Sequence, residues 1–231
     1  MARSVRSDPA ADLRLIDGPE DAPAAVLLAH GAGAPMDSPF LAAMASGLAE
    51  RGWRVVRFEF PYMARARETG RRQGPDRMPV LQEAFRAQVR LERLAFPERP
   101  VVVAGKSMGG RVASQVVDEL AASGDACRCL CLGYPFHPPG KPQQLRIEHL
   151  SAQRSPTLIL QGERDPFGRP EEVATYELSP QVQLQWIPYG DHSFKPTRRS
   201  GLSEAENLAA AVAWSDGFLQ ELIGKPSPPS G

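Results

Sequence analysis

The stretch Val101-Val102-Val103-Ala104-Gly105-Lys106-Ser107-Met108-Gly109-Gly110 decides how this chain of 231 residues folds. A short apolar run is followed at once by a glycine-rich turn, and apolar residues at helical spacing come after it. The pattern predicts a buried strand, a tight turn with Ser107 at its tip, and a helix start. Glycines two residues before and after the serine avoid a collision of side chains across the turn. Such a G-x-S-x-G elbow exposes the serine hydroxyl above a sheet edge, although a turn with an incidental serine is the alternative.

Short apolar runs and longer periodic stretches alternate along the rest of the chain. The expected strands are residues 13–16, 25–29, 54–60, 101–104, 129–133, 157–161 and 182–187. Five helices are expected: one that begins at Ser38, one over 80–94, one directly after the elbow, one over 170–177, and one that begins at Ser203. Glu206 completes a capping box at the start of the last one. This alternation predicts an α/β fold with a doubly wound, mostly parallel sheet and helices on both faces.

We expect one domain over residues 12–223, between a disordered start at 1–11 and a disordered tail at 224–231. The arginine-rich segment 63–78 is expected to be a loop that is either simply solvated or steers an anionic substrate. Residues 136–155 are the one place where a small cap could sit, and they are too few for an elaborate lid.

Composition narrows the function classes. Lysine plus arginine and aspartate plus glutamate both number 27, and this balance argues against phosphate-driven nucleic-acid binding. No run of about 18 apolar residues is present, so we expect no membrane insertion, and the first residues lack a secretory signal, which predicts a cytoplasmic protein. Cys127, Cys129 and Cys131 alternate along one expected strand without a second ligand cluster, so we expect buried thiols, no metal and no cofactor.

A serine nucleophile needs a base, which we expect to be His192. In this type of fold the order along the chain is serine, acid, histidine. His192 lies in a polar loop just past the last expected strand, where a side chain can reach an elbow at the carboxyl edge of the sheet. His137 comes before any acid-bearing strand end, and His149 is expected on a helix surface.

The acid that orients the base is expected to be Asp165, directly after the strand at 157–161. A carboxylate there can accept the second N–H of the histidine and stabilise the imidazolium. Glu163 and Asp191 are alternatives; Asp191 is next to the base in sequence, which makes their side chains meet awkwardly.

Two backbone N–H groups are needed to stabilise an oxyanion. We expect one from Met108, just after the nucleophile, and the other from Ala32 in the loop His30-Gly31-Ala32-Gly33. Lys106 and Arg111 flank the nucleophile and favour an anionic ligand, unless Lys106 points away from the pocket.

Several sequence blocks together carry a resemblance to a known family. They are LAHGAGA (28–34), GKSMGGR (105–111), YPFHPPGKP (134–142), QGERDPFG (161–168) and GDHSF (190–194). The chain resembles the α/β-hydrolase fold from about residue 13 to 223. Within it, the chain is similar to the family of testis-expressed protein 30, the hydrolase-like region of the third subunit of the nuclear NSL complex, and small bacterial hydrolase-like proteins. The resemblance implies a serine-hydrolase scaffold with Ser107, Asp165 and His192 at the triad positions.

These expectations lead to one main functional hypothesis and two alternatives. The main one is a serine hydrolase that acts on an ester or thioester of a small-molecule acyl substrate through an acyl-enzyme intermediate. The second is a catalytically silent module that binds a protein partner, because the eukaryotic relatives are associated with complexes. The third keeps the fold but changes the reaction, as in a dienelactone or lactone hydrolase or an acyltransferase.

Overall fold

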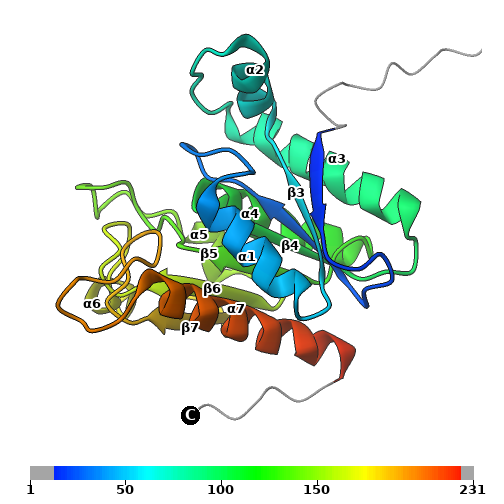
Figure 1. Cartoon of the computed structure of the whole chain (residues 1–231). Coiled ribbons are helices and arrows are strands. Elements are labelled where there is room, and N and C mark those ends of the chain that lie inside the picture. Colours follow the sequence, from blue (N-terminus) through cyan, green and yellow to red (C-terminus); the bar gives the residue numbers. More distant parts are fainter. Residues whose placement is uncertain (1–12, 225–231) are drawn as a thin grey trace, which may run out of the picture.

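Seven strands form one sheet in the computed structural model, which describes residues 13–224 (Figure 1). They are β1 (Arg14–Asp17), β2 (Ala25–Ala29), β3 (Arg54–Phe58), β4 (Val101–Lys106), β5 (Arg128–Leu132), β6 (Thr157–Gly162) and β7 (Val182–Ile187). Their order in the sheet is β1-β3-β2-β4-β5-β6-β7, with β1 antiparallel to β3 and every other pair parallel. The predicted mostly parallel, doubly wound sheet is confirmed. The expectations for residues 1–11 and 225–231 lie outside the described residues.

Helices cover both faces of the sheet. They are α1 (Pro39–Ala49), α2 (Pro61–Thr69), α3 (Met78–Ala95), α4 (Met108–Ala122), α5 (Glu148–Ser151), α6 (Pro170–Val173) and α7 (Glu204–Gln220), followed by the 3-10 turn η2 (Glu221–Ile223). Alternate residues of the central strands enter opposite cores: Val103 of β4 packs with α3 and α4, and Val102 packs with α1 and α7. This side-chain alternation buries both faces, as a parallel sheet requires.

The sequence predicted the cap of α7 better than that of α1. The Ser203 side chain accepts a hydrogen bond from the backbone N–H of Glu206, and the Glu206 carboxylate accepts one from the Ser203 N–H, so the capping box is present. Ser38 occupies the N-cap position of α1, but its side chain makes no capping hydrogen bond. Pro39 supplies the helical start there, because its fixed φ suits the first turn and it has no N–H to satisfy.

The expectation that residues 63–78 form a loop is wrong for their first half. Helix α2 spans Pro61–Thr69 and ends at Gly70, which adopts a left-handed φ of 65°. Proline in its first turn favours a helix start, and the arginine, alanine, methionine and glutamate that follow are good helix formers. The density of arginine therefore hid a short helix. Residues 70–77, which follow it, are the loop.

Smaller differences concern other elements. β3 ends at Phe58, two residues earlier than expected, and α6 ends at Val173 rather than at residue 177. Cys129 and Cys131 are buried on β5, whereas Cys127 precedes the strand and is only half-buried, against the opposite core. The segment 136–155 holds only the short helix α5.

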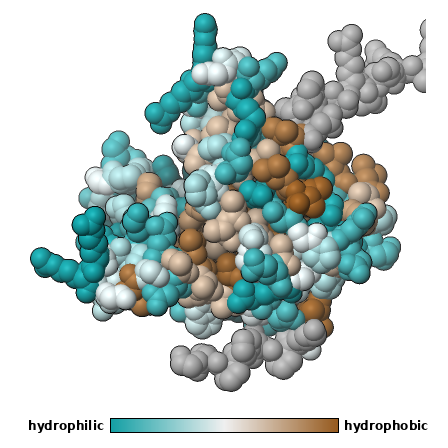
Figure 2. Space-filling model, in the orientation of Figure 1, coloured by the Kyte–Doolittle hydropathy of each residue, from teal (hydrophilic) through white to brown (hydrophobic). Residues whose placement is uncertain are grey.

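The outer surface is mixed in polarity. In Figure 2 the top of the molecule, where α2 lies in Figure 1, is largely hydrophilic. Across residues 13–224, no helix combines the length and the apolar character that crossing a bilayer requires.

Candidate active site

Ser107 lies at the tip of a strained turn between β4 and α4. Its φ is 52° and its ψ is −114°, a conformation that non-glycine residues rarely adopt. A Cβ added at Gly109 would lie 2.6 Å from the carbonyl oxygen of His30, and one at Gly105 would collide with the backbone of Gly109. The turn therefore requires the glycines on both sides of the serine, and it holds the Ser107 side chain at the carboxyl edge of the sheet.

The structure brings Ser107, His192 and Asp165 together from three different strand ends. His192 Nε2 lies 2.9 Å from Ser107 Oγ, and His192 Nδ1 lies 2.7 Å from Asp165 Oδ2. With Nδ1–H donated to the carboxylate, Nε2 is free to accept the serine hydroxyl proton. A hydroxyl, an imidazole and a carboxylate in this order form the arrangement that activates a serine as a nucleophile.

Asp165 is fully buried and its second oxygen is also satisfied. Asp165 Oδ1 accepts a hydrogen bond from the Phe167 N–H at 2.9 Å, and the Phe167 ring packs on the His192 ring with centroids 4.3 Å apart. The two other acidic candidates have different partners. Glu163 accepts from the backbone N–H of Tyr189, and Asp191 accepts from those of Ser193 and Lys195.

The loop that contains Ala32 lies directly beside the nucleophile. A Cβ added at Gly31 would lie 3.6 Å from Ser107 Cβ, an ordinary van der Waals contact, so the loop packs against the turn that holds the nucleophile. The Tyr62 hydroxyl lies 3.0 Å from the carbonyl oxygen of Ala32 and 3.2 Å from that of Gly31, and it donates to them. These bonds fix the loop from the side of α2.

His30 supports the same loop from the protein interior. It is fully buried, and burial lowers the pKa of its ring, which favours the neutral form. Nδ1 donates to the Gly31 carbonyl at 2.6 Å, and Nε2 accepts from the Phe60 N–H at 3.0 Å. The ring therefore links the end of β3 to the loop after β2, and its role is structural.

The Lys106 ammonium group points toward the His192 loop and is bonded within the protein, so it is not free to attract an anionic ligand. The side chain is buried, and its Nζ donates to the backbone carbonyl of His192 at 2.6 Å. Burial lowers the pKa of this lysine to about 8, against the opposing attraction of Asp165 and Asp191. A Cβ at Gly133, which has a φ of 67°, would lie 2.9 Å from the same carbonyl oxygen, so this glycine leaves room for the contact.

The other histidines of the carboxyl-terminal half have separate partners. His137 donates from Nδ1 to the Pro138 carbonyl at 2.9 Å. His149 lies in α5 as expected, but it is half-buried rather than on the surface, and its Nε2 is 2.9 Å from Ser114 Oγ. Burial and the nearby Arg111 lower its pKa to about 4.

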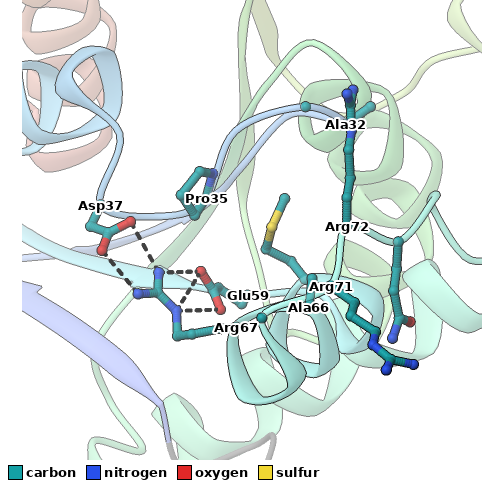
Figure 3. Close-up of a pocket in the computed structure, with 12 residues that line it drawn as sticks. Ala32, Pro35, Asp37, Glu59, Ala66, Arg67, Arg71 and Arg72 are labelled. Carbon is teal, nitrogen blue, oxygen red and sulfur yellow. Dashed lines mark hydrogen bonds and ion pairs between the residues drawn. The ribbon is translucent and has the colours of Figure 1, made fainter.

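A surface cavity of about 640 Å³ lies beside the Ala32 loop (Figure 3). Its walls come from the loop after β2, the end of β3, helix α2 and the segment that follows α2. Within it, Arg67 donates to both the buried Glu59 and the half-exposed Asp37, at distances from 2.6 to 3.2 Å. These ion pairs tie α2 to the end of β3 and to the loop before α1.

Sequence reasoning missed Tyr62, the contact from Lys106 to His192 and the ion pairs of Arg67. The proline at position 61 was a usable signal for a helix that carries Tyr62 to the Ala32 loop. No local pattern could indicate the Lys106 contact, because it joins residues 86 positions apart.

Comparisons with known proteins agree with this architecture. The family model of an alpha/beta hydrolase domain matches residues 22–220 of the chain. An alpha-beta serine hydrolase homologue from Coxiella burnetii superposes with a TM-score of 0.66 at 18% identity, over 87% of this chain and 90% of that one. A serine hydrolase without a lid from Xanthomonas campestris gives a TM-score of 0.63 at 22% identity, over 94% and 90%. A dienelactone hydrolase from Anabaena variabilis gives 0.67 at 21% identity, over 90% of both chains.

Proposed function

The chain belongs to the alpha/beta hydrolase domain family, and we propose that it is a serine hydrolase that cleaves an ester or thioester of a small-molecule acyl substrate. The single observation that carries the proposal is the chain of hydrogen bonds from Ser107 through His192 to Asp165. Each of the three side chains follows a different parallel strand. Residues this far apart in the sequence would rarely meet in this order by accident.

In the proposed reaction, Ser107 Oγ attacks the acyl carbonyl carbon while His192 Nε2 takes the hydroxyl proton. Asp165 stays ionised and stabilises the imidazolium that forms. The carbonyl oxygen becomes an oxyanion, which the backbone N–H groups of Met108 and Ala32 stabilise. The N–H of Met108 is suited to this role because the first-turn donors of a helix lack intrahelical acceptors.

The tetrahedral intermediate then collapses to an acyl-enzyme, which water hydrolyses. His192 returns the proton to the alcohol or thiol leaving group as the bond from carbon to that group breaks, which leaves an acyl ester on Ser107. A water molecule attacks this ester while His192 takes one of its protons. His192 then returns that proton to Ser107 Oγ as the bond from the acyl carbon to Oγ breaks, which releases the acid product and regenerates Ser107. The same residues thus act once on the substrate and once on water.

The sequence blocks named above further support a place beside the testis-expressed protein 30 group, which supplies no substrate. A lactone is the second candidate substrate, because a structure described as a dienelactone hydrolase shares the fold. Ring opening of a lactone uses the same attack, and the alcohol leaving group stays attached to the acyl product.

Turnover on a matched panel of p-nitrophenyl esters, acyl thioesters and lactones tests the proposal. The wild-type protein should hydrolyse at least one class, and Ser107→Ala should lower kcat by about 10⁴ to 10⁶. Asp165→Asn should lower it by about 10⁴, because the amide favours the wrong histidine tautomer. Wild-type protein without turnover on any class and without covalent labelling by an acyl-enzyme probe would favour the silent binding module instead.

A further inference from the structure

The cavity beside the Ala32 loop contains arginine side chains that the proposed mechanism does not use. We propose that this cavity binds a carboxylate carried by the acyl substrate, and that Arg72 recognises it. The inference rests on the proposed function, because it places the carboxylate next to the carbonyl that Ser107 attacks. It narrows the substrate class from any acyl ester to one that bears an anionic group.

Arg72 faces the loop that would hold the oxyanion. In Figure 3 its side chain extends toward Ala32. A second, smaller hollow of about 450 Å³ is also lined by Ala32 and Arg72, together with Gly33 and Gln73. Arg72 therefore lines both hollows, together with the proposed oxyanion donor Ala32.

The segment that carries Arg72 is tied back to α2. Arg65 donates to the side chain of Gln73 at 3.2 Å and to that of Asp76 at 2.7 Å. Helix α2 is in turn held by the ion pairs of Arg67 with Glu59 and Asp37. Arg65 and Arg67 thus anchor the backbone of the segment that carries Arg72, so less backbone freedom is lost when Arg72 binds a ligand.

Charge in the cavity is not balanced by the protein itself. The lining contains three arginines and two carboxylates, and both carboxylates are bonded to Arg67. Across residues 13–224, the side chains of Arg71 and Arg72 have no acidic or carbonyl hydrogen-bond partner. The lining therefore has a net charge of +1, with its two unpaired guanidinium groups at the rim formed by residues 70–73.

A carboxylate suits these groups in geometry and size. The planar fork of an arginine matches the two oxygens of a carboxylate, and charge-assisted hydrogen bonds are the stronger kind. A volume of about 640 Å³ lies within the range of small-molecule sites. Ala32 lines both hollows and is also the proposed oxyanion donor, so we place the carboxylate on the acyl part of the substrate, as in a half-ester of a short dicarboxylic acid.

The test compares the mono-p-nitrophenyl ester of glutaric acid with its methyl ester, which has nearly the same size but no charge. For the wild-type protein, kcat/KM should be higher for the acid, and the preference should shrink as salt is added. Arg72→Gln should lower the preference by roughly tenfold and leave the neutral ester nearly unchanged. Arg90→Gln is the matched control, since Arg90 is exposed on α3 and pairs only with Glu83 among the described residues.

A binding measurement separates this inference from the proposed function. Glutarate should bind the Ser107→Ala protein in calorimetry and bind more weakly when Arg72→Gln is added, whether or not any ester is turned over. The inference is overturned if the wild-type protein prefers the neutral ester, or if Arg72→Gln leaves the preference for the acid intact. In either case, covalent labelling of Ser107 would still support the hydrolase proposal. A carboxylate on the leaving group is tested with 4-carboxyphenyl butyrate and its methyl ester; an Arg72-dependent preference for that pair alone overturns the acyl-side assignment.

Discussion

Lys106 Nζ donates a hydrogen bond to the backbone carbonyl of His192 at 2.6 Å, directly beside the serine that the histidine contacts. The residue before the proposed nucleophile thus holds the loop of the proposed base. Because Lys106 makes no hydrogen bond to Ser107 Oγ or to the imidazole nitrogens, we infer that it acts by positioning the histidine.

Lys106→Met keeps the apolar stem and removes the donor, so the His192 loop should lose its anchor. We expect the rate at which a fluorophosphonate labels Ser107 to fall by roughly ten- to a hundredfold, since small misplacements of reacting groups are costly. The Tm should not fall in parallel, because the change also removes a buried ammonium group. Lys195→Met on the same loop is the control, as Lys195 is exposed and pairs with Glu204. Equal labelling rates for Lys106→Met and wild type would refute the positioning role.

Tyr62→Phe removes the hydroxyl that donates to the carbonyl groups of Gly31 and Ala32. The Ala32 loop should loosen, so kcat should fall several-fold while KM changes little, and stability should fall by about 1 kcal/mol. Steady-state kinetics and urea unfolding measure the two effects. Tyr189→Phe is the matched control because Tyr189 is half-exposed. An unchanged kcat in Tyr62→Phe would show that this hydrogen bond does not support catalysis.

Gly109→Ala places a Cβ 2.6 Å from the His30 carbonyl oxygen and 2.7 Å from that of Ala29. Both neighbours are backbone atoms that cannot rotate aside, so we expect a loss of stability of about 2–3 kcal/mol or failure to fold. Gly74→Ala is the control, since an added Cβ there has no heavy atom within 4 Å. Urea midpoints compare the two variants, and similar small shifts for both would contradict the close packing of the elbow.

His149 should make the protein sensitive to acid. Its folded-state pKa of about 4 lies below the ordinary 6.5, so the unfolded chain binds a proton between these values that the folded chain does not. The stability of wild type relative to His149→Gln should therefore fall as the pH drops from 6.5 to 4. Glutamine retains a partner for Ser114 Oγ and does not titrate. Urea unfolding at pH 7, 5.5 and 4.5 measures the difference, and a difference independent of pH would contradict the burial of a neutral ring.

The sequence could predict the sheet and the convergence of Ser107, Asp165 and His192 because local rules govern both. Glycine spacing sets the elbow, and parallel strands bring their carboxyl ends to one edge. The side-chain contacts that tune the site follow different rules. Whether Lys106 points into the His192 loop depends on the packing of segments far apart in the chain. The density of arginine hid α2, and the pairing of Arg67 with Glu59 and Asp37 likewise depends on tertiary packing.

Covalent labelling of Ser107 by a fluorophosphonate tests the central claim most directly. Intact-mass measurement of the wild-type protein should show the addition of one phosphonyl group, and peptide mapping should place it on Ser107. The Ser107→Ala protein should remain unlabelled under the same conditions while it keeps the wild-type Tm within about 2 °C. A wild-type protein that stays unlabelled, or a Ser107→Ala protein that labels at the wild-type rate, would contradict the account.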